Sequence, residues 1–439
     1  MTISVQKRRE IVDALRRGTV PRQGLDQFAV GMDRFVDAVD DELGSVKAGA
    51  SQFKAVRGEY GCGKTFFSRW LQERAKKQGF AVAEVQISET ETPLHRLETV
   101  YRRLMERLST GNTQEGAFRS IIDGWFYTLE EDLIASGKAR ASDETALLEE
   151  SNLLMEQRLQ SVARQAPAFA AGLRGYRRAM AAGQPAIAEG LLAWVAGQPN
   201  VGAEIKRFAA IKGEIDHFAA LNFLQGLLVI LRDSGHKGLL ICLDEVETLQ
   251  RMRGDVRDKG LNALRQLIDE VDTGRFPGLY ILITGTPSFF DGPQGVQRLP
   301  PVAQRLHVDF KTDERFDNPR AVQIRLKGFN LDSLTELGCR IRDIYCEHGD
   351  HAGRVANLAN DEYVRHLAAA VTGRLGGKVG IAPRIFLKKL VGEVLDRLDQ
   401  FPDFVPTRDY ELTLTEAEMT VTERAASSAK GVDDIEINV

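Results

Sequence analysis

The octapeptide GEYGCGKT, Gly58–Thr65, decides which fold this chain is expected to have. It fits the pattern G-x-x-x-x-G-K-T, which forms a phosphate-binding loop where it joins a strand to a helix. The preceding residues 52–57, QFKAVR, alternate as in a short strand, and apolar residues at helical spacing follow the loop until Gly79. Those apolar residues are Phe66, Phe67, Trp70, Leu71 and Ala75. The sequence therefore predicts a loop that binds a nucleoside triphosphate.

The residue types within this loop suit a triphosphate for physical reasons. Glycines allow backbone conformations that are closed to residues with a Cβ, so that N–H groups can turn inward around a phosphate. The N-terminus of the following helix adds a partial positive charge. Lys64 is expected to reach the β- and γ-phosphates of ATP, and the Thr65 hydroxyl to coordinate Mg²⁺. The expected nucleotide contacts are Gly58, Glu59, Tyr60, Gly61, Cys62, Gly63, Lys64, Thr65 and Phe66.

A second segment supplies the acidic partner that such a loop requires. In GLLICLDEVETL, residues 238–249, an apolar run ends in Asp244 and Glu245. A continuous apolar run indicates a parallel strand that is buried on both faces. Asp244 is expected to hold Mg²⁺ through water, and Glu245 to take a proton from an attacking water as the general base. The pair favours hydrolysis over binding alone.

A third apolar strand is expected in GLYILITGTP, residues 278–287. Its end should lie beside Asp244, because ligands collect at the carboxyl ends of the strands in parallel sheets. Thr284 or Thr286 is then placed to orient the lytic water, and we favour Thr284. The alternative is that either hydroxyl caps the following backbone.

Three arginines follow these strands. Arg298 and Arg305 lie in GVQRLPPVAQRLHVDF, where oligomeric ATPases place an arginine that reaches the γ-phosphate of a neighbour and accelerates hydrolysis by about 10³–10⁵. We favour Arg305, which is expected in a short helix, although either residue could be an ordinary surface cation. Arg384 follows Pro383 at the start of a predicted helix and is expected to point back at the nucleotide.

The composition of the chain limits the classes of function that remain. The chain has 439 residues, a formal charge of −4 and a pI of about 6.1, which does not favour coating of nucleic acid by bulk charge. Residues 1–23 are locally basic and form either a solvated helix face or a DNA contact. No apolar run approaches the roughly 18 residues of a membrane span, and no signal peptide is visible, so a cytoplasmic protein without membrane contact is expected. The four scattered cysteines agree with that compartment.

The order of these parts resembles an AAA+ ATPase of the origin-recognition branch. A narrower resemblance, to the P-loop proteins of bacterial BREX phage-defence systems, spans most of the chain. It rests on LRRGTVPRQGLDQFAVG, VRGEYGCGKTFF, LDEVETLQRMRGDVRDKGLNALRQL, ITGTPSFFDGPQGV and PRAVQIRLKGF. The resemblance implies an α/β AAA+ core with a parallel sheet, ATP and Mg²⁺ as cofactors, and other BREX components as partners. Assembly into a homo-oligomer and contact with DNA through the basic N-terminal segment are further expectations.

Asp244 follows Lys64 by 180 residues, far more than the roughly 60 that two βαβ crossovers need. We therefore expect a large helical insertion, which forms either a partner surface or a plain packed subdomain. The predicted organisation is a basic helical segment (1–23), a first core part (24–108), the insertion (109–205), a second core part (206–330), a helical lid (331–410) and a tail (411–439) that ends in disorder. A winged-helix DNA-binding domain of the kind that follows the lid in origin-recognition proteins is not visible.

Three functions compete at this point. The first is an ATP-hydrolysing motor or loader that acts on DNA or partner proteins within a defence complex. The second is a slow nucleotide-controlled switch or scaffold, which the missing DNA-binding domain favours. A small-molecule kinase is disfavoured by Glu245 and by the helical lid.

Overall fold

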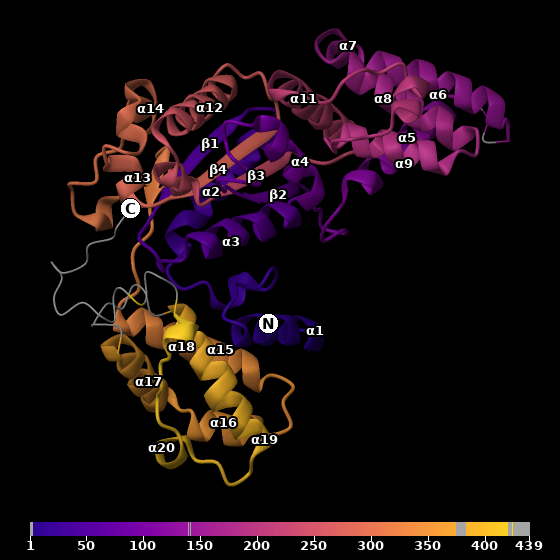
Figure 1. Ribbon diagram of the computed structural model, residues 1–439. Coiled ribbons are helices and arrows are strands. Elements are labelled where there is room, and N and C mark those ends of the chain that lie inside the picture. The colour runs from indigo at the N-terminus through magenta and orange to yellow at the C-terminus, as the bar shows by residue number, and fades with distance from the viewer. Residues whose placement is uncertain (1–2, 139, 141, 375–382, 420–423, 425–439) are drawn as a thin grey trace.

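The computed structural model describes residues 3–138, 140, 142–374, 383–419 and 424. A parallel sheet with helices on both faces forms the centre of the molecule (Figure 1). A group of helices extends from one end of this core, and a second helical lobe lies below it and contains both α1 and the C-terminal helices. The predicted disorder at the end of the tail concerns residues 427–439, which lie outside the described residues.

The sheet contains five strands in the order β2-β3-β4-β1-β5, and every neighbouring pair is parallel. The strands are β1 (Gln52–Arg57), β2 (Ala81–Gln86), β3 (Leu239–Asp244), β4 (Leu279–Gly285) and β5 (Gln323–Arg325). Arg57 pairs with Gly285, and Gln86 pairs with Asp244, so the carboxyl ends of four strands meet at one edge of the sheet. The predicted mixed α/β architecture with a parallel sheet is confirmed.

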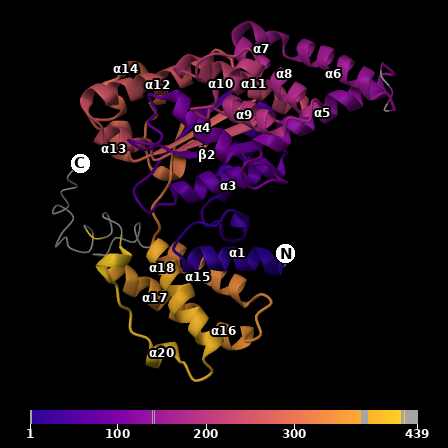
Figure 2. The ribbon, with the colours of Figure 1, turned by 45° about the vertical axis from the view of Figure 1, so that its right-hand side comes forward.

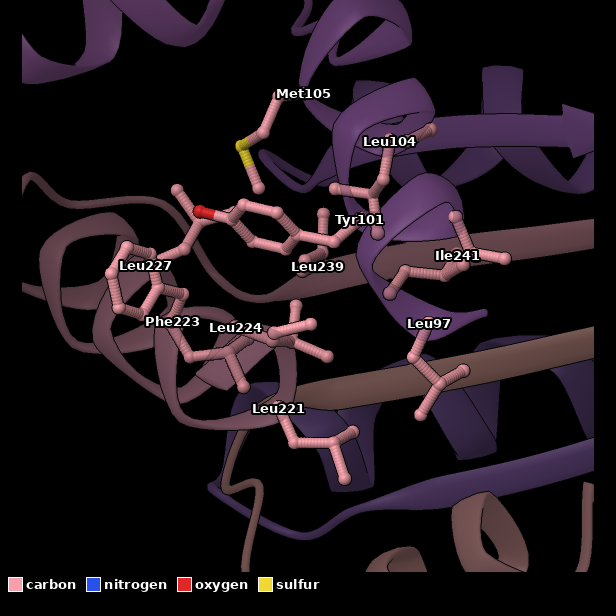
Figure 3. Close-up of a cluster of buried hydrophobic side chains, with 14 of the residues drawn as sticks. Leu97, Tyr101, Leu104, Met105, Leu221, Phe223, Leu224, Leu227, Leu239 and Ile241 are labelled. Atoms are coloured by element: carbon pink, nitrogen blue, oxygen red, sulfur yellow. The ribbon is translucent and has the colours of Figure 1, made fainter. Parts of the chain in front are cut away.

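Alternating residues of the strands serve two separate cores. In β3, Leu239 and Ile241 face the core formed with α4 (Leu97–Arg107), α11 (His217–Asp233) and α12 (Gly254–Asp272). Figure 3 shows the Tyr101 ring of α4 beside Phe223 and Leu227 of α11. Leu240 and Cys242 face the opposite core, which includes α2 (Asp33–Lys47) and α3 (Lys64–Lys77). Burial on both faces explains why the strand sequence is continuously apolar.

The helical group between β2 and β3 extends beyond the core (Figures 1 and 2). It comprises α5 (Phe118–Ala135), α6 (Glu144–Arg158), α7 (Gln160–Gln165), α8 (Pro167–Ala181), α9 (Pro185–Val195) and α10 (Ala203–Phe208). Pro167 and Pro185 lie in the first turns of α8 and α9, where a missing N–H costs nothing. The Trp125 indole of α5 donates to Asp233 of α11 at 2.6 Å, and this bond ties the group to the core.

The helices after the sheet form a lobe below the phosphate loop. They are α15 (Leu331–Cys346), α16 (Ala352–Leu358), α17 (Asp361–Arg374), α18 (Pro383–Lys389), a π-helical turn (Leu390–Leu395), α19 (Asp396–Gln400) and α20 (Pro406–Asp409). Short segments connect β4 to β5, namely α13 (Pro287–Asp291), a 3₁₀ turn (Val296–Arg298), α14 (Pro300–Leu306) and a second 3₁₀ turn (Glu314–Phe316). Among the described residues, no helix combines the length and the apolar character needed to cross a bilayer.

The basic N-terminal helix α1 (Val5–Arg16) packs on this C-terminal lobe (Figures 1 and 2). The Arg16 guanidinium donates to both oxygens of Asp396, at 2.6 and 2.9 Å. Arg8 donates to the Tyr345 carbonyl at 2.8 Å and stacks over the Tyr345 ring. The sequence left two alternatives for the basic residues of this segment, a solvated helix face or a DNA contact. Two of them, Arg8 and Arg16, instead bind acceptors within the molecule that are distant in sequence.

Candidate nucleotide-binding site

The phosphate loop connects the end of β1 to the start of α3. Gly61 and Gly63 have φ angles of 82° and 96°, which are readily adopted only by glycine. At Gly58, an added Cβ would lie 2.3 Å from Cys62 Sγ, so the close approach of the chain to itself requires glycine there. The ammonium of Lys64 donates to the carbonyls of Gly58 at 2.8 Å and Glu59 at 3.3 Å. The loop thus curls around the lysine that the sequence assigns to the phosphates.

The N-terminus of α3 opens onto the same hollow. The first N–H groups of a helix have no acceptors within the helix, and they carry a partial positive charge that attracts anions. Lys64, Thr65 and Phe66 form this first turn, and all three line a cavity of about 280 Å³. Because the helix has 14 residues, its dipole is fully developed at this end.

Asp244 at the end of β3 forms the opposite wall. Its carboxylate accepts from the Thr65 hydroxyl at 3.1 Å, from the Glu245 N–H at 3.2 Å and from the Thr284 hydroxyl. Burial raises the pKa of Asp244, and the donated hydrogen bonds from the threonines oppose that rise. A hydroxyl and a carboxylate in contact are the hard oxygen ligands that Mg²⁺ prefers. The residue types and their contact therefore fit the ion that accompanies ATP.

Glu245 turns away from the strand direction directly after Asp244. Its φ of 59° is unusual for a residue other than glycine, and it places an exposed side chain at the same cavity. Gln86, at the end of β2, donates to the Glu245 carboxylate at 2.8 Å. Sequence reasoning did not include Gln86, because nothing local marks a glutamine 159 positions away as the partner of Glu245.

Glu247 is a second residue that sequence reasoning missed. Its side chain is 6% exposed, lines the cavity, and has one carboxylate oxygen 3.9 Å from the Lys64 ammonium. Burial is the main cause that raises the pKa of Glu247 to about 7. The available signal was the spacing in DEVE, which adds a third carboxyl group within four residues of the strand end.

The two candidate threonines of β4 have different surroundings. The Thr284 side chain is buried, and its hydroxyl donates to Asp244 while it accepts the Glu245 N–H at 3.3 Å. The Thr286 hydroxyl instead bonds to that of Ser288 at 2.9 Å. Thr284 therefore belongs to the carboxylate cluster, whereas Thr286 contacts its own turn.

The cavity extends from the phosphate loop to the C-terminal lobe. Its apolar wall includes Val20, Pro21 and Phe28 from the segment after α1, together with Leu387 from α18. Arg384 also lines it and donates to the Glu418 carbonyl at 2.7 Å. Arg384 therefore lies in the wall of the candidate site, beside the segment after α1, which sequence reasoning had not assigned to it.

Arg298 and Arg305 do not line this cavity. Arg298 pairs with Asp258, and Arg305 pairs with Asp269 at 2.6 Å, both on α12. Arg305 lies in α14, the short helix expected for it, and its side chain is partly exposed. Within one chain, neither arginine belongs to the same cluster as Lys64.

A parallel sheet whose carboxyl edge carries a glycine-rich loop, a lysine and a buried aspartate is consistent with a P-loop core that binds nucleoside triphosphates. The chain belongs to the BREX system ATP-binding protein BrxC/D family, whose model matches residues 3–414. A search of curated protein sequences found no match. Membership implies an ATP-binding component of a phage-defence system that works with other BREX components.

Proposed function

We propose that the chain is an Mg²⁺-dependent AAA+ ATPase of a BREX defence system and that it corresponds to the BrxD branch of its family. One observation carries the proposal: Lys64, Thr65, Asp244 and Glu245 meet at one cavity although they come from segments about 180 residues apart. The helical lobe that closes the cavity supports the AAA+ assignment. The motifs quoted from residues 15–31 and 243–267 support the BrxD branch.

The roles follow from the geometry. Lys64 would leave the carbonyls of Gly58 and Glu59 for the β- and γ-phosphates, which offer charged acceptors in their place. Thr65 and Asp244 would hold Mg²⁺, which neutralises the charge that develops on the phosphates. Glu245 would accept the proton of the attacking water, because it is exposed to the cavity and its recorded partner among the described residues is the neutral Gln86.

Completion of the site by a second subunit is part of this proposal. Arg298 and Arg305 lie on the α13–α14 side and do not line the cavity of their own chain, so in an assembly either could serve the nucleotide of a neighbour. Their pairing with α12 carboxylates would then break on assembly. The work performed on DNA or on partner proteins would be coupled to this assembled state.

A slow switch or scaffold is the second candidate. The observation that favours it is the hydrogen bond that Gln86 donates to Glu245, which engages the proposed general base. DNA contact also has less support than the sequence suggested, since Arg8 and Arg16 are bound to the C-terminal lobe. Such a protein would bind ATP tightly and turn it over rarely.

The deciding experiment combines ATP binding with steady-state hydrolysis, each measured with and without DNA. Lys64→Ala should abolish tight binding, because it removes the cation at the centre of the loop. Glu245→Gln should retain binding within a few-fold and stop turnover, because the nearly isosteric amide cannot accept a proton. Equal loss of affinity in both variants would refute the assigned roles. Tight binding by the wild type with a turnover no faster than that of Glu245→Gln would establish the switch instead.

A further inference from the structure

Glu247 is a buried acid in the wall of the candidate nucleotide site. It lies on the 3₁₀ turn Val246–Arg251 that follows β3, and the residue is only 5% exposed. Its Oε2 atom is buried and has no hydrogen-bond partner among the described residues. A buried polar atom without a partner costs free energy, so its presence in a native structure calls for an explanation such as a function.

Among the described residues, Lys64 is the cation that pairs with this carboxyl group. The Lys64 ammonium lies 3.9 Å from Glu247 Oε1 and is also held by two loop carbonyls. The other charged or titratable groups around Glu247 are Asp244 and Glu245 at the end of β3, Tyr60 in the loop, Arg251 on its own turn and Arg384 across the cavity. Within the chain itself, Lys64 is therefore the counterion of Glu247.

A bound triphosphate changes the electrostatic environment of Glu247 in two ways. It attracts Lys64 away from Glu247, because phosphate oxygens are stronger acceptors than a carboxylate 3.9 Å away. It also adds net negative charge to a cavity that already holds three carboxyl groups, because one Mg²⁺ offsets only part of the charge of the triphosphate. Either change disfavours the ionised form of a buried acid. Burial already raises the pKa of Glu247 to about 7, so its proton is within reach at neutral pH.

We infer that Glu247 exchanges its partner when the nucleotide binds: the triphosphate takes Lys64, and Glu247 takes one proton from solution. This inference rests on the proposed ATP site and names a positioning residue for Lys64. The exchange of partners makes nucleotide affinity fall as pH rises. The sign follows because binding raises the pKa of Glu247 further, so affinity is greatest below the pKa of the free protein and declines above it.

Isothermal titration calorimetry with ATP and Mg²⁺ tests the exchange directly, in two buffers of different ionisation enthalpy at pH 7 and pH 8. Wild-type protein should take up as much as one proton per ATP more than Glu247→Gln. Comparison with the variant removes the protonation of ATP itself. From pH 7 to pH 8 the wild-type affinity should fall about fivefold relative to Glu247→Gln, because a group with a pKa of about 7 is already half ionised at pH 7. At pH 8 the variant should bind ATP about tenfold more tightly.

Asp255→Asn is the matched control, because it removes an exposed carboxylate at the start of α12, outside the cavity. It should titrate like wild type. Equal proton counts and parallel pH profiles for wild type and Glu247→Gln would overturn the inference while leaving ATP binding intact. Absence of ATP binding by wild type would overturn the proposed site as well. If Glu247→Gln does not fold, the wild-type proton count decides, because zero net uptake beyond that of ATP refutes the exchange.

Discussion

Thr284→Val separates two roles for the buried threonine of β4. The Thr284 hydroxyl donates to Asp244 and accepts the Glu245 N–H at 3.3 Å, and its side chain is fully buried. Valine keeps the branched shape and removes only the oxygen. The sequence suggested that Thr284 orients the lytic water, but the hydroxyl is already engaged by protein groups on both its donor and acceptor sides. We therefore expect it to position Asp244.

The size of the effect follows from the donors of Asp244. Among the described residues its carboxylate has three of them, the hydroxyls of Thr284 and Thr65 and the N–H of Glu245. A hydrogen bond to a charged group contributes about 1.5–3 kcal/mol, and burial of Asp244 limits compensation by water. Loss of about 2 kcal/mol from the ionised, correctly oriented carboxylate corresponds to roughly 30-fold weaker Mg²⁺-dependent binding of ATP.

The assay is a titration of Mg²⁺ at fixed ATP, with binding and turnover recorded together. Thr284→Val should raise the half-saturating Mg²⁺ concentration by about 30-fold and leave turnover at saturating Mg²⁺ within a few-fold of wild type. Thr286→Val is the comparison, since the Thr286 hydroxyl bonds only to Ser288 among the described contacts. An unchanged Mg²⁺ midpoint with a turnover reduced by orders of magnitude would refute the positioning role and restore the role in orienting water.

Two further predictions concern assembly and stability. Arg305→Ala should keep ATP binding and lose hydrolysis, and mixing it with Lys64→Ala should recover activity, because one variant supplies an intact loop and the other an intact arginine. Inactive mixtures of proteins that demonstrably co-assemble would contradict a role of Arg305 in a neighbour and move the test to Arg298. Lys54→Met should lower the free energy of unfolding in urea by about 3–5 kcal/mol, because it strands the buried Glu42 carboxylate without its cation. The double variant Lys54→Met/Glu42→Leu should recover most of that loss, because it removes both buried charges. If Lys54→Met alone costs less than about 1 kcal/mol, the burial of this ion pair that the structure indicates is wrong.

Pairs such as Lys54 with Glu42 show where sequence patterns stop being informative. Lys54 is fully buried and Glu42 is nearly so. Burial raises the pKa of Glu42 and lowers the pKa of Lys54. Neither fact can be read from a charged residue in an alternating strand. An isolated lysine in β1 looks like a solvent-facing position until α2 brings its partner.

Local chemistry explains what could be predicted. The phosphate loop, the apolar strand before Asp244 and the helix that begins at Pro383 each depend on residues within one short segment. Backbone freedom at glycine, burial on both faces of a strand and the preference of proline for a first helical turn act over a few positions. The parallel sheet then followed, because strands separated by helices can pair only through crossovers.

Only the tertiary structure decided which distant groups share the site. The sequence by itself predicted Lys64, Thr65, Asp244 and Glu245 as the chemical groups of a triphosphate site. The fold added the bond from Gln86 to Glu245 and the place of Glu247 beside Lys64, and it turned Arg305 toward Asp269. It also docked α1 on the C-terminal lobe, so that the segment after α1 forms a wall of the cavity. These contacts depend on strand order and on helix docking, which the whole chain sets through burial of its apolar faces, and no short segment encodes them.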